Sequence, residues 1–292
     1  MTTAHKDWHD LLACPIHHDK LDTTDEGLKC PTCHAIYPVR DSVVHFLSGD
    51  TGPRSALVGI DGSTMVRGYR EPSKFVSALR SVVSSEYYPG TGWRDAKKSV
   101  SAGKAPYVVI GSGTSRYPGG LHLDIDDFPG VDLVGTAESL PFLDGSLEGA
   151  LSEVVLEHVE RPDHVIAETF RVLKPGGRFF FIAPFLFPFH GHPSDYRRWS
   201  KQGLAADFDA FTDIEIGIYG GPCSAMVNLL TEWCYVVTGL EFPRGYTAIK
   251  GLATLLLFPF KFIDALVNRF PEAHRLAATM YVTGRKPGGD VV

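Results

Sequence analysis

One segment, residues 107–185, constrains the fold of this chain more than any other feature of the sequence. It opens with an apolar run at 107–110 that leads directly into a glycine turn, and a second apolar run ends in Asp124. A stretch with helical apolar spacing follows at 162–173, before another strongly apolar run. Such an alternation of strands and helices predicts an α/β fold around a mainly parallel sheet. The expected strands are 107–110, 121–124, 131–134, 149–155, 178–184, 213–219 and 278–284, with helices at 162–173 and 201–209.

The glycine turn and the acid after it indicate a nucleoside site. Glycines let the backbone approach a ribose closely, and a carboxylate that ends the next strand can accept hydrogen bonds from both ribose hydroxyls. Only seven residues, Thr114–Gly120, join the two strands, whereas a crossover that contains a helix takes at least ~10–12. The first crossover helix is therefore expected to be short or missing. A pyrophosphate would lose its helix N-terminus, and Arg116 stands in place of the third dinucleotide glycine, so the pattern disfavours NAD. The alternative is a tight loop with a solvated Asp124.

Two further motifs carry a family resemblance. Glu157-His158-Val159 precedes the expected helix at 162–173, and Leu173-Lys174-Pro175-Gly176-Gly177 follows it. With the glycine turn, they resemble the class I S-adenosylmethionine-dependent methyltransferases. The resemblance implies a Rossmann-like sheet, the cofactor S-adenosyl-L-methionine and methyl transfer. It also implies a cofactor site at Gly111, Ser112, Gly113, Asp124, Ala137, Glu138, Ser152 and Glu153. We expect His158 to anchor its turn by a hydrogen bond, and the two glycines to end the helix.

The chain departs from this family at three positions. Val109 stands where the family carries an acidic residue that orients the amino-acid end of the donor. Ser115 replaces the third glycine, and Thr136 replaces the aspartate that often precedes the adenine-contacting alanine. These departures keep an alternative open, in which a degenerate methyltransferase fold serves as a partner-binding module.

The segment after the strand at 178–184 is expected to carry the substrate chemistry, because open α/β sheets place their ligands beyond the carboxyl ends of central strands. Within nine residues it holds His190, His192, Asp195, Tyr196, Arg197 and Arg198. One of the two histidines would accept a proton and Asp195 would orient it, while Tyr196 and an arginine would bind the acceptor. In the alternative, Asp195 and an arginine form an ion pair that only holds the loop. A metal site made from the two histidines is disfavoured because no third ligand is apparent in the sequence.

Residues 1–48 are expected to form a small module with two pairs of metal ligands. Cys14-x-x-His17 and Cys30-x-x-Cys33 are separated by twelve residues, and Zn²⁺ favours four sulfur and nitrogen ligands in a tetrahedron. The spacing predicts a structural zinc site, in which His18 and His34 leave the nitrogen ligand ambiguous. The surrounding residues resemble the Trm112-like zinc ribbons, and we expect a scaffold or a lid. The alternatives are a metal-free module with buried cysteines and a redox pair at Cys30 and Cys33.

The rest of the chain divides into a linker and a large domain. Residues 49–105 are expected to be a linker with one helix near Ser73–Ser85, and residues 106–292 the methyltransferase domain, with an apolar helical insertion at 221–276 before the last strand. Only ten uncharged residues lie between Lys250 and Lys261, whereas a membrane-spanning helix needs ~20. The insertion is expected to be a helical cap over the site, a homodimer surface, or a peripheral membrane contact for lipid-linked acceptors.

Charge and cysteine content narrow the partners. The formal net charge is −6, and residues 1–50 hold four Lys or Arg against eight acidic residues. Because nonspecific nucleic-acid affinity comes from Lys and Arg, these charges argue against an RNA methyltransferase. The five cysteines and the polar first ten residues favour a reducing cytoplasm over a secreted disulfide scaffold. The expected acceptor is a small molecule, a sugar or a lipid-linked intermediate.

Overall fold

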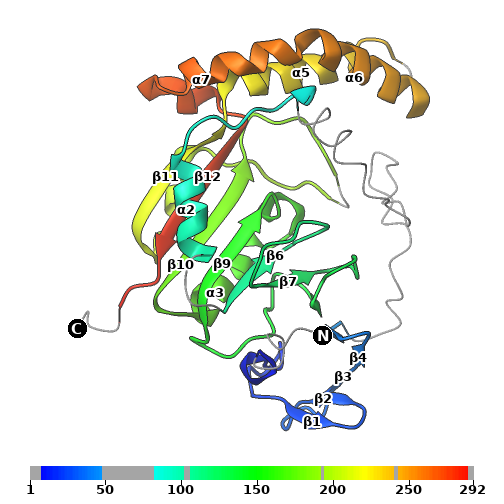
Figure 1. Cartoon of the computed structure of the whole chain (residues 1–292), viewed down its shortest axis with the longest axis vertical. Helices are drawn as coiled ribbons and strands as arrows, with labels where there is room; N and C mark the ends of the chain where they lie inside the picture. Colours follow the sequence, from blue (N-terminus) through cyan, green and yellow to red (C-terminus); the bar gives the residue numbers. More distant parts are fainter. Residues whose placement is uncertain (1–7, 48–81, 102–105, 192–193, 240–242, 289–292) are drawn as a thin grey trace.

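The computed structural model describes residues 8–47, 82–101, 106–191, 194–239 and 243–288. His192 and most of the helix expected near 73–85 lie outside the described residues. The described chain contains a nine-stranded sheet with helices on both faces, a small three-stranded sheet near the N-terminus and a layer of helices at one end (Figure 1).

The large sheet has the strand order β11-β12-β10-β9-β6-β7-β8-β5-β4. Six neighbouring strands, from β10 to β5, run parallel, while β12 is antiparallel to both β10 and β11. The strands are β4 (Val39–Arg40), β5 (Val43–His45), β6 (Tyr107–Ile110), β7 (Gly120–Asp124), β8 (Leu133–Val134), β9 (Leu147–Glu153), β10 (Leu173–Pro184), β11 (Thr212–Gly220) and β12 (Thr279–Arg285). The chain leaves β6 toward β7 on one side and returns to β9 on the other. The sheet therefore has its topological switch point between β6 and β9, where open α/β sheets bind ligands.

Alternating side chains of the central strands pack against helices on opposite faces. Val109 lies in a cluster with Val100 of α2 (Gly92–Ser101), on the face that α2 covers. Val108 lies in the other cluster, with Val165 of α3 (Pro162–Val172) and Leu204 of α4 (Lys201–Asp207). This alternation is the period of two that a strand imposes on its side chains. The α/β architecture predicted from the sequence is confirmed.

The first crossover contains no helix, as its length predicted. All residues between β6 and β7 are described, and they form turns. The prediction for Gly176-Gly177 was wrong: α3 ends at Val172, and both glycines lie inside β10. Gly176 has a φ of +78°, and the register of β10 against β9 shifts between Leu173 and Arg178. The glycines therefore form a bulge in the strand, where a left-handed residue is accommodated, rather than a helix cap.

The N-terminal unit has a small sheet of its own and also contributes two strands to the large sheet. Its own sheet is formed by β1 (Asp22–Thr24), β2 (Gly27–Lys29) and β3 (Ile36–Tyr37). The next hairpin, β4-β5, then pairs with the edge of the large sheet through β5 and β8. A second attachment runs through the loop after β8, where the Ala13 N–H donates to the Pro141 carbonyl at 3.1 Å and the Leu143 N–H to the Leu11 carbonyl at 2.9 Å. The N-terminal unit thus braces the loop that begins with Thr136.

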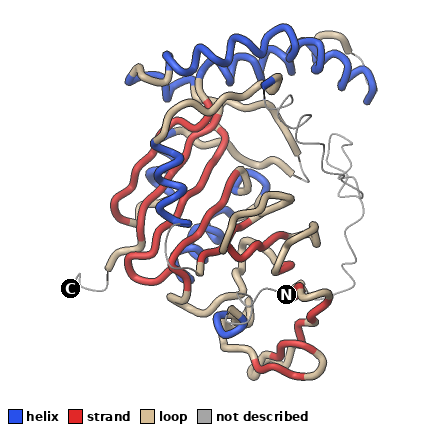
Figure 2. Tube along the Cα trace, in the orientation of Figure 1, coloured by secondary structure: helices blue, strands red, loops and turns tan. Residues whose placement is uncertain are grey.

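The described residues of the segment 221–276 form helices between the last two strands, β11 and β12. They are α5 (Pro222–Val236), α6 (Pro243–Leu257), η3 (Phe258–Ile263), α7 (Asp264–Val267) and η4 (Pro271–Leu276). The buried Asp264 carboxylate accepts hydrogen bonds from the N–H groups of Cys223 and Ser224 at 2.8 and 2.9 Å, at the N-terminus of α5. An acid is stabilising there because it satisfies unpaired N–H groups and opposes the helix dipole. Figures 1 and 2 show this helical layer beyond the carboxyl ends of β9 and β10. None of the described helices is both long and apolar enough to cross a membrane.

Candidate functional site

The glycine turn follows β6 at the switch point of the sheet. Gly111 has a φ of +64°, and a Cβ atom placed on it would lie 2.4 Å from a methyl group of Val155. Gly113 has a φ of +50° with open space around it. The Gly111 and Ser112 N–H groups donate to the Leu123 carbonyl at 2.9 and 3.1 Å. Both glycines are thus required by the backbone conformation, and Gly111 is required by packing as well.

Asp124 ends β7 beside this turn. Its carboxylate accepts hydrogen bonds from the Gly113 N–H at 2.7 Å and from the Asp126 N–H at 3.1 Å. Burial of the side chain raises the pKa of Asp124, although both hydrogen bonds act in the opposite direction. The carboxylate braces the turn and keeps lone pairs that a ribose hydroxyl could use.

Two hydroxyl groups lie buried at the switch point without a hydrogen-bond partner among the described residues. They are Ser112 Oγ, just after β6, and Ser152 Oγ, on β9 opposite Ile110. Ser112 is 4% exposed and Ser152 1%. Buried hydroxyls are normally hydrogen-bonded, so two orphans at this position indicate a place where a polar ligand supplies the partner.

A charged cluster lies at the end of β9 on the face covered by α2. Lys97 of α2 donates to Glu153 at 2.6 Å and to the Tyr117 hydroxyl at 2.8 Å, and that hydroxyl also donates to Glu153. Glu153 is a predicted cofactor residue, whereas Lys97 and Tyr117 were not predicted from the sequence. Lys97 and Tyr117 are far from Glu153 in the sequence, so no motif indicated that the three side chains meet. The packing of α2 brings Lys97 to Glu153, and the helix-free crossover brings Tyr117 to it.

Ala137 and Glu138 lie in the loop that the N-terminal unit braces. Ala137 is buried, and Glu138 accepts a hydrogen bond from the Arg161 N–H at 3.0 Å, at the start of α3. The loop is thus held by the N-terminal unit and by the start of α3. It lies close to the carboxyl end of β8, where adenine is expected to bind.

A second group of titratable side chains lies beyond β9 and β10. Glu157 and His158 belong to η2 (Leu156–His158), and His190 follows β10. His190 Nε2 lies 3.3 Å from Glu157 Oε1, and His158 Nε2 lies 3.9 Å from the same oxygen. Burial acts to lower the pKa of His190, but the Glu157 carboxylate, the Pro188 carbonyl and the Asp195 carboxylate together raise it. The backbone is strained just before this turn. Val154 has a φ of +59°, which a β-branched residue rarely adopts.

The histidines are held by their other ring nitrogens. His158 Nδ1 lies 2.6 Å from the Ser194 carbonyl, a contact that links η2 to the loop after β10. His190 Nδ1 lies 3.2 Å from the Pro188 carbonyl and 3.4 Å from Asp195 Oδ2. A third carboxylate, that of Glu86, comes from the segment before α2. Burial raises the pKa of Glu86, although the charge of His190 acts to lower it.

Asp195 forms an ion pair with an arginine, which was the alternative to a catalytic role for this residue. Both of its oxygens bind Arg198, and Oδ2 also accepts the His190 N–H at 2.9 Å. Arg198 is further committed to the carbonyls of Phe187 and Pro188. Asp195 therefore holds the loop and contacts His190 at the same time. The side chain of Tyr196 is about half exposed, and its N–H donates to the Glu157 carbonyl at 2.7 Å.

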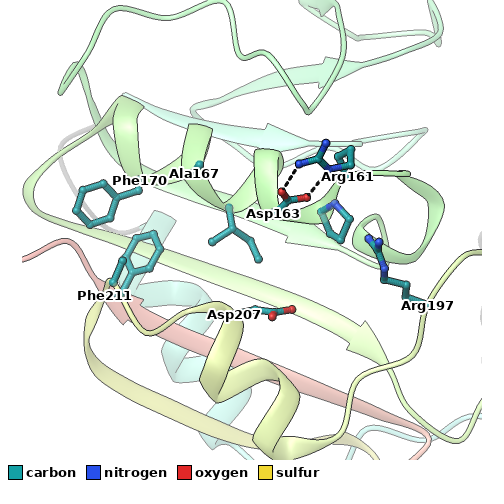
Figure 3. Close-up of a pocket in the computed structure, with 10 residues that line it drawn as sticks. Arg161, Asp163, Ala167, Phe170, Arg197, Asp207 and Phe211 are labelled. Atoms are coloured by element: carbon teal, nitrogen blue, oxygen red, sulfur yellow. Dashed lines mark hydrogen bonds and ion pairs between the residues drawn. The ribbon is translucent and has the colours of Figure 1, made fainter.

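Arg197 points to a different part of the surface. It donates to the Glu160 carbonyl at 2.9 Å and lines an open cavity of about 790 Å³ between α3 and the α4 region. Figure 3 shows Arg197 facing this cavity together with Arg161 and its ion-pair partner Asp163. Phe170 and Phe211 form its apolar wall. Of the predicted site residues, only Arg197 lines it.

Four side chains of the N-terminal unit converge as metal ligands do. Each of Cys14, His17, Cys30 and Cys33 offers one ligand atom, and all four atoms lie within 4.8 Å of one another. Cys14 Sγ lies 3.9 Å from Cys33 Sγ and 3.7 Å from His17 Nδ1. With Zn–S near 2.3 Å, the tetrahedral angle places two sulfurs about 3.8 Å apart. The donor set and spacing fit Zn²⁺.

Of the three candidate histidines, His17 is the one that lies in this cluster. His18 has a φ of +58° and turns toward Glu168, 4.0 Å away, and His34 is outside the cluster. Burial acts to raise the pKa of Cys14, but hydrogen bonds from the Tyr37 hydroxyl and from backbone N–H groups lower it to about 6. A thiolate is the form that binds a metal.

Two segments of the chain match known protein families. Residues 118–181 match the methyltransferase domain family, and residues 5–42 match the Trm112p-like protein family. A demethylmenaquinone methyltransferase of Renibacterium salmoninarum is 33% identical over 119 residues, which cover 34% of this chain and 50% of that protein. A malonyl-[acyl-carrier protein] O-methyltransferase of Methylococcus capsulatus is 44% identical over 57 residues, 18% of this chain and 21% of that one. This chain spans half or less of the length of these curated relatives.

Solved structures resemble the chain more distantly. The [4+2]-cyclase SpnF has a TM-score of 0.43 at 16% identity and covers 73% of this chain and 93% of its own. A complex between the Haloferax volcanii Trm112 methyltransferase activator and a methyltransferase has a TM-score of 0.39 at 19% identity, over 75% and 98% of the two chains. The family segments confirm the resemblance predicted from the sequence: this chain carries a Trm112p-like segment at residues 5–42 and a methyltransferase domain segment at residues 118–181.

Proposed function

We propose that the chain is an S-adenosylmethionine-dependent methyltransferase that acts on an O, N or C nucleophile of a small-molecule, sugar or lipid-linked acceptor. The observation that carries the proposal is a pair of buried hydroxyls, those of Ser112 and Ser152, at the switch point beside Asp124. Neither has a hydrogen-bond partner within the part of the chain that the structure describes. In this assignment Asp124 binds the ribose, the two serines bind polar atoms of the donor, and the loop at Ala137-Glu138 receives the adenine.

The cluster of Glu153, Lys97 and Tyr117 supports binding of the donor's methionine end. A zwitterionic amino acid needs an acceptor for its ammonium group and a donor for its carboxylate, and the cluster offers both. It also accounts for the departure at Val109. Val109 pairs with Leu151 on the face covered by α2, and Glu153 lies two residues farther along the same face of β9. The carboxylate that the family takes from the first strand would come here from the fourth.

Methyl transfer is an in-line displacement at the sulfonium. The acceptor's lone pair forms a bond to the methyl carbon while the carbon–sulfur bond breaks, and its electrons remain on sulfur, which yields S-adenosylhomocysteine. An O–H or N–H nucleophile must also lose a proton. We assign the acceptor to the space beside His190, with Tyr196 at its margin; in this reading His190 accepts the proton, and His192, which lies outside the described residues, is the second candidate from the sequence.

The helical insertion and the N-terminal unit support this site from two sides. The insertion lies beyond the carboxyl ends of the parallel strands (Figure 1), where a cap would exclude water from the reaction. Its outer surface carries exposed apolar side chains, among them Trp233, which is 60% exposed, and Leu256, which is 71% exposed. These would suit a dimer partner or a lipid-linked acceptor. The N-terminal unit, proposed to hold structural Zn²⁺, would act as a scaffold for the adenine loop.

Calorimetric titration with S-adenosylmethionine and S-adenosylhomocysteine tests the proposal. We expect micromolar binding of both by zinc-loaded protein. No binding by folded, zinc-loaded protein would instead favour a degenerate module that binds a partner. An RNA methyltransferase would bind RNA with an affinity that falls steeply with salt, and no RNA binding at low salt would remove that alternative.

A further inference from the structure

We propose that Glu157, His158 and His190 bind a divalent transition-metal ion, at a site separate from the cysteine cluster. One ligand atom from each of the three side chains lies within 4.8 Å of the others. The site lies beyond the carboxyl ends of β9 and β10, at the edge of the sheet that also carries the glycine turn. The site differs from the pair of His190 and His192 considered from the sequence, because Glu157 and His158 become neighbours of His190 only through the parallel pairing of β9 with β10.

The Glu157 carboxylate is the strongest indication of a ligand. Its side chain is 0% exposed, and neither oxygen has a hydrogen-bond partner among the described residues. Nε2 of His190 is also buried, and its contact among the described residues is the 3.3 Å ion pair with Glu157 Oε1. Burying an ionised carboxylate without hydrogen bonds is costly unless a cation neutralises it. A metal ion between these atoms would satisfy all of them.

The distances match those between ligands of one ion. Two ligands about 2.1 Å from a metal lie about 3.4 Å apart at the tetrahedral angle. The distances from Glu157 Oε1 to His190 Nε2 and His158 Nε2 are 3.3 and 3.9 Å. The two imidazole rings are nearly perpendicular, at 81°, with centroids 5.0 Å apart. Both rings can therefore direct Nε2 at a common point without stacking.

The outer contacts are those of metal-binding histidines. His158 Nδ1 is directed at the Ser194 carbonyl, and His190 Nδ1 at the Pro188 carbonyl and Asp195. Metal-ligating histidines usually donate their second ring N–H to a carbonyl or a carboxylate, which fixes the tautomer and leaves Nε2 free for the ion. Arg198 holds Asp195 in place from the other side. Two imidazoles and one carboxylate select Zn²⁺, Fe²⁺, Mn²⁺ or Co²⁺ rather than Ca²⁺.

Three protein ligands would leave a coordination position for another molecule. If the proposed methyl transfer holds, that position would suit the oxygen of a hydroxyl acceptor, whose pKa a bound cation lowers. His190 would then serve as a metal ligand, and the cation in its place would activate the acceptor. Only this last step rests on the proposed function; the metal site itself does not.

The test uses Co²⁺ and the full-length protein with zinc already in the cysteine cluster. We expect one cobalt per chain beyond the zinc, with visible absorption but without the sulfur-to-cobalt charge-transfer bands that a thiolate site gives. Glu157→Gln and His190→Gln should each weaken cobalt binding at least ~10-fold, since even residues that only orient metal ligands contribute 10–100-fold. His164→Gln, which removes an exposed imidazole from α3, is the matched control and should bind cobalt as the wild type does.

Three results would overturn the proposal: no cobalt uptake by the zinc-loaded wild type, uptake with thiolate bands, or unchanged affinity in both variants. If a variant fails to fold, the stoichiometry and spectrum of the wild type still decide. Calorimetry with S-adenosylmethionine on the same preparations separates the two proposals, because donor binding without cobalt uptake would leave the His190–Glu157 pair as a proton acceptor and remove the metal.

Discussion

Gly111→Ala should destabilise the protein far more than Gly113→Ala, although both glycines lie in one turn with positive φ. A left-handed alanine costs about 1–2 kcal/mol at either position. At position 111 the new Cβ would also lie 2.4 Å from Val155 Cγ2, whereas nothing lies within 4 Å at position 113. Overpacking of this kind costs about 1–3 kcal/mol more. We therefore expect a loss of about 2–5 kcal/mol for Gly111→Ala and about 1–2 kcal/mol for Gly113→Ala.

Urea unfolding of a double-mutant cycle isolates the steric part. Val155→Ala removes the methyl groups that the new Cβ would meet, so Gly111→Ala should cost about 1–3 kcal/mol less in that background than in the wild type. The residual cost should equal that of Gly113→Ala. Equal losses for the two single glycine variants, or a coupling energy near zero, would refute the reasoning that Val155 packs against the turn.

Three further variants probe the site and its supports. Asp124→Ala should weaken S-adenosylmethionine binding about 10- to 100-fold in calorimetry, because hydrogen bonds to a charged group contribute ~1.5–3 kcal/mol; the exposed Asp127→Ala is the control, and unchanged affinity of the Asp124 variant would exclude the ribose role. Asp264→Ala should lower the free energy of unfolding by about 3 kcal/mol, since it leaves the N–H groups of Cys223 and Ser224 unsatisfied in a buried place; a loss no larger than that of the exposed Asp209→Ala would contradict this. Cys30→Ser should release zinc, lower the melting temperature and weaken donor binding, because the N-terminal unit is hydrogen-bonded to the loop after β8. Cys234→Ser serves as the control. Full donor affinity in zinc-free protein would show that the N-terminal unit does not support the site.

Local patterns gave the elements of the fold. Strands 107–110 and 121–124 and the missing crossover helix follow from apolar runs and from the number of residues between them. The helix end at Gly176-Gly177 was misplaced because a glycine with positive φ fits both a helix cap and a strand bulge, and only the pairing of β10 with β9 distinguishes the two. The ambiguity between His17 and His18 had the same origin, since adjacent histidines differ only in the direction that the folded turn gives them.

The sequence by itself determined the kind of fold, the glycine turn with its acid, and the two pairs of candidate metal ligands in the N-terminal unit. Each of these depends on residues within one turn or on two neighbouring strands. The tertiary structure decided which distant side chains meet. Lys97 reaches Glu153 only because α2 packs across the sheet. Glu157 lies beside His190 only because β9 and β10 are parallel neighbours that end at the same edge. Contacts of this kind depend on the packing of the whole sheet, which no short stretch of sequence encodes.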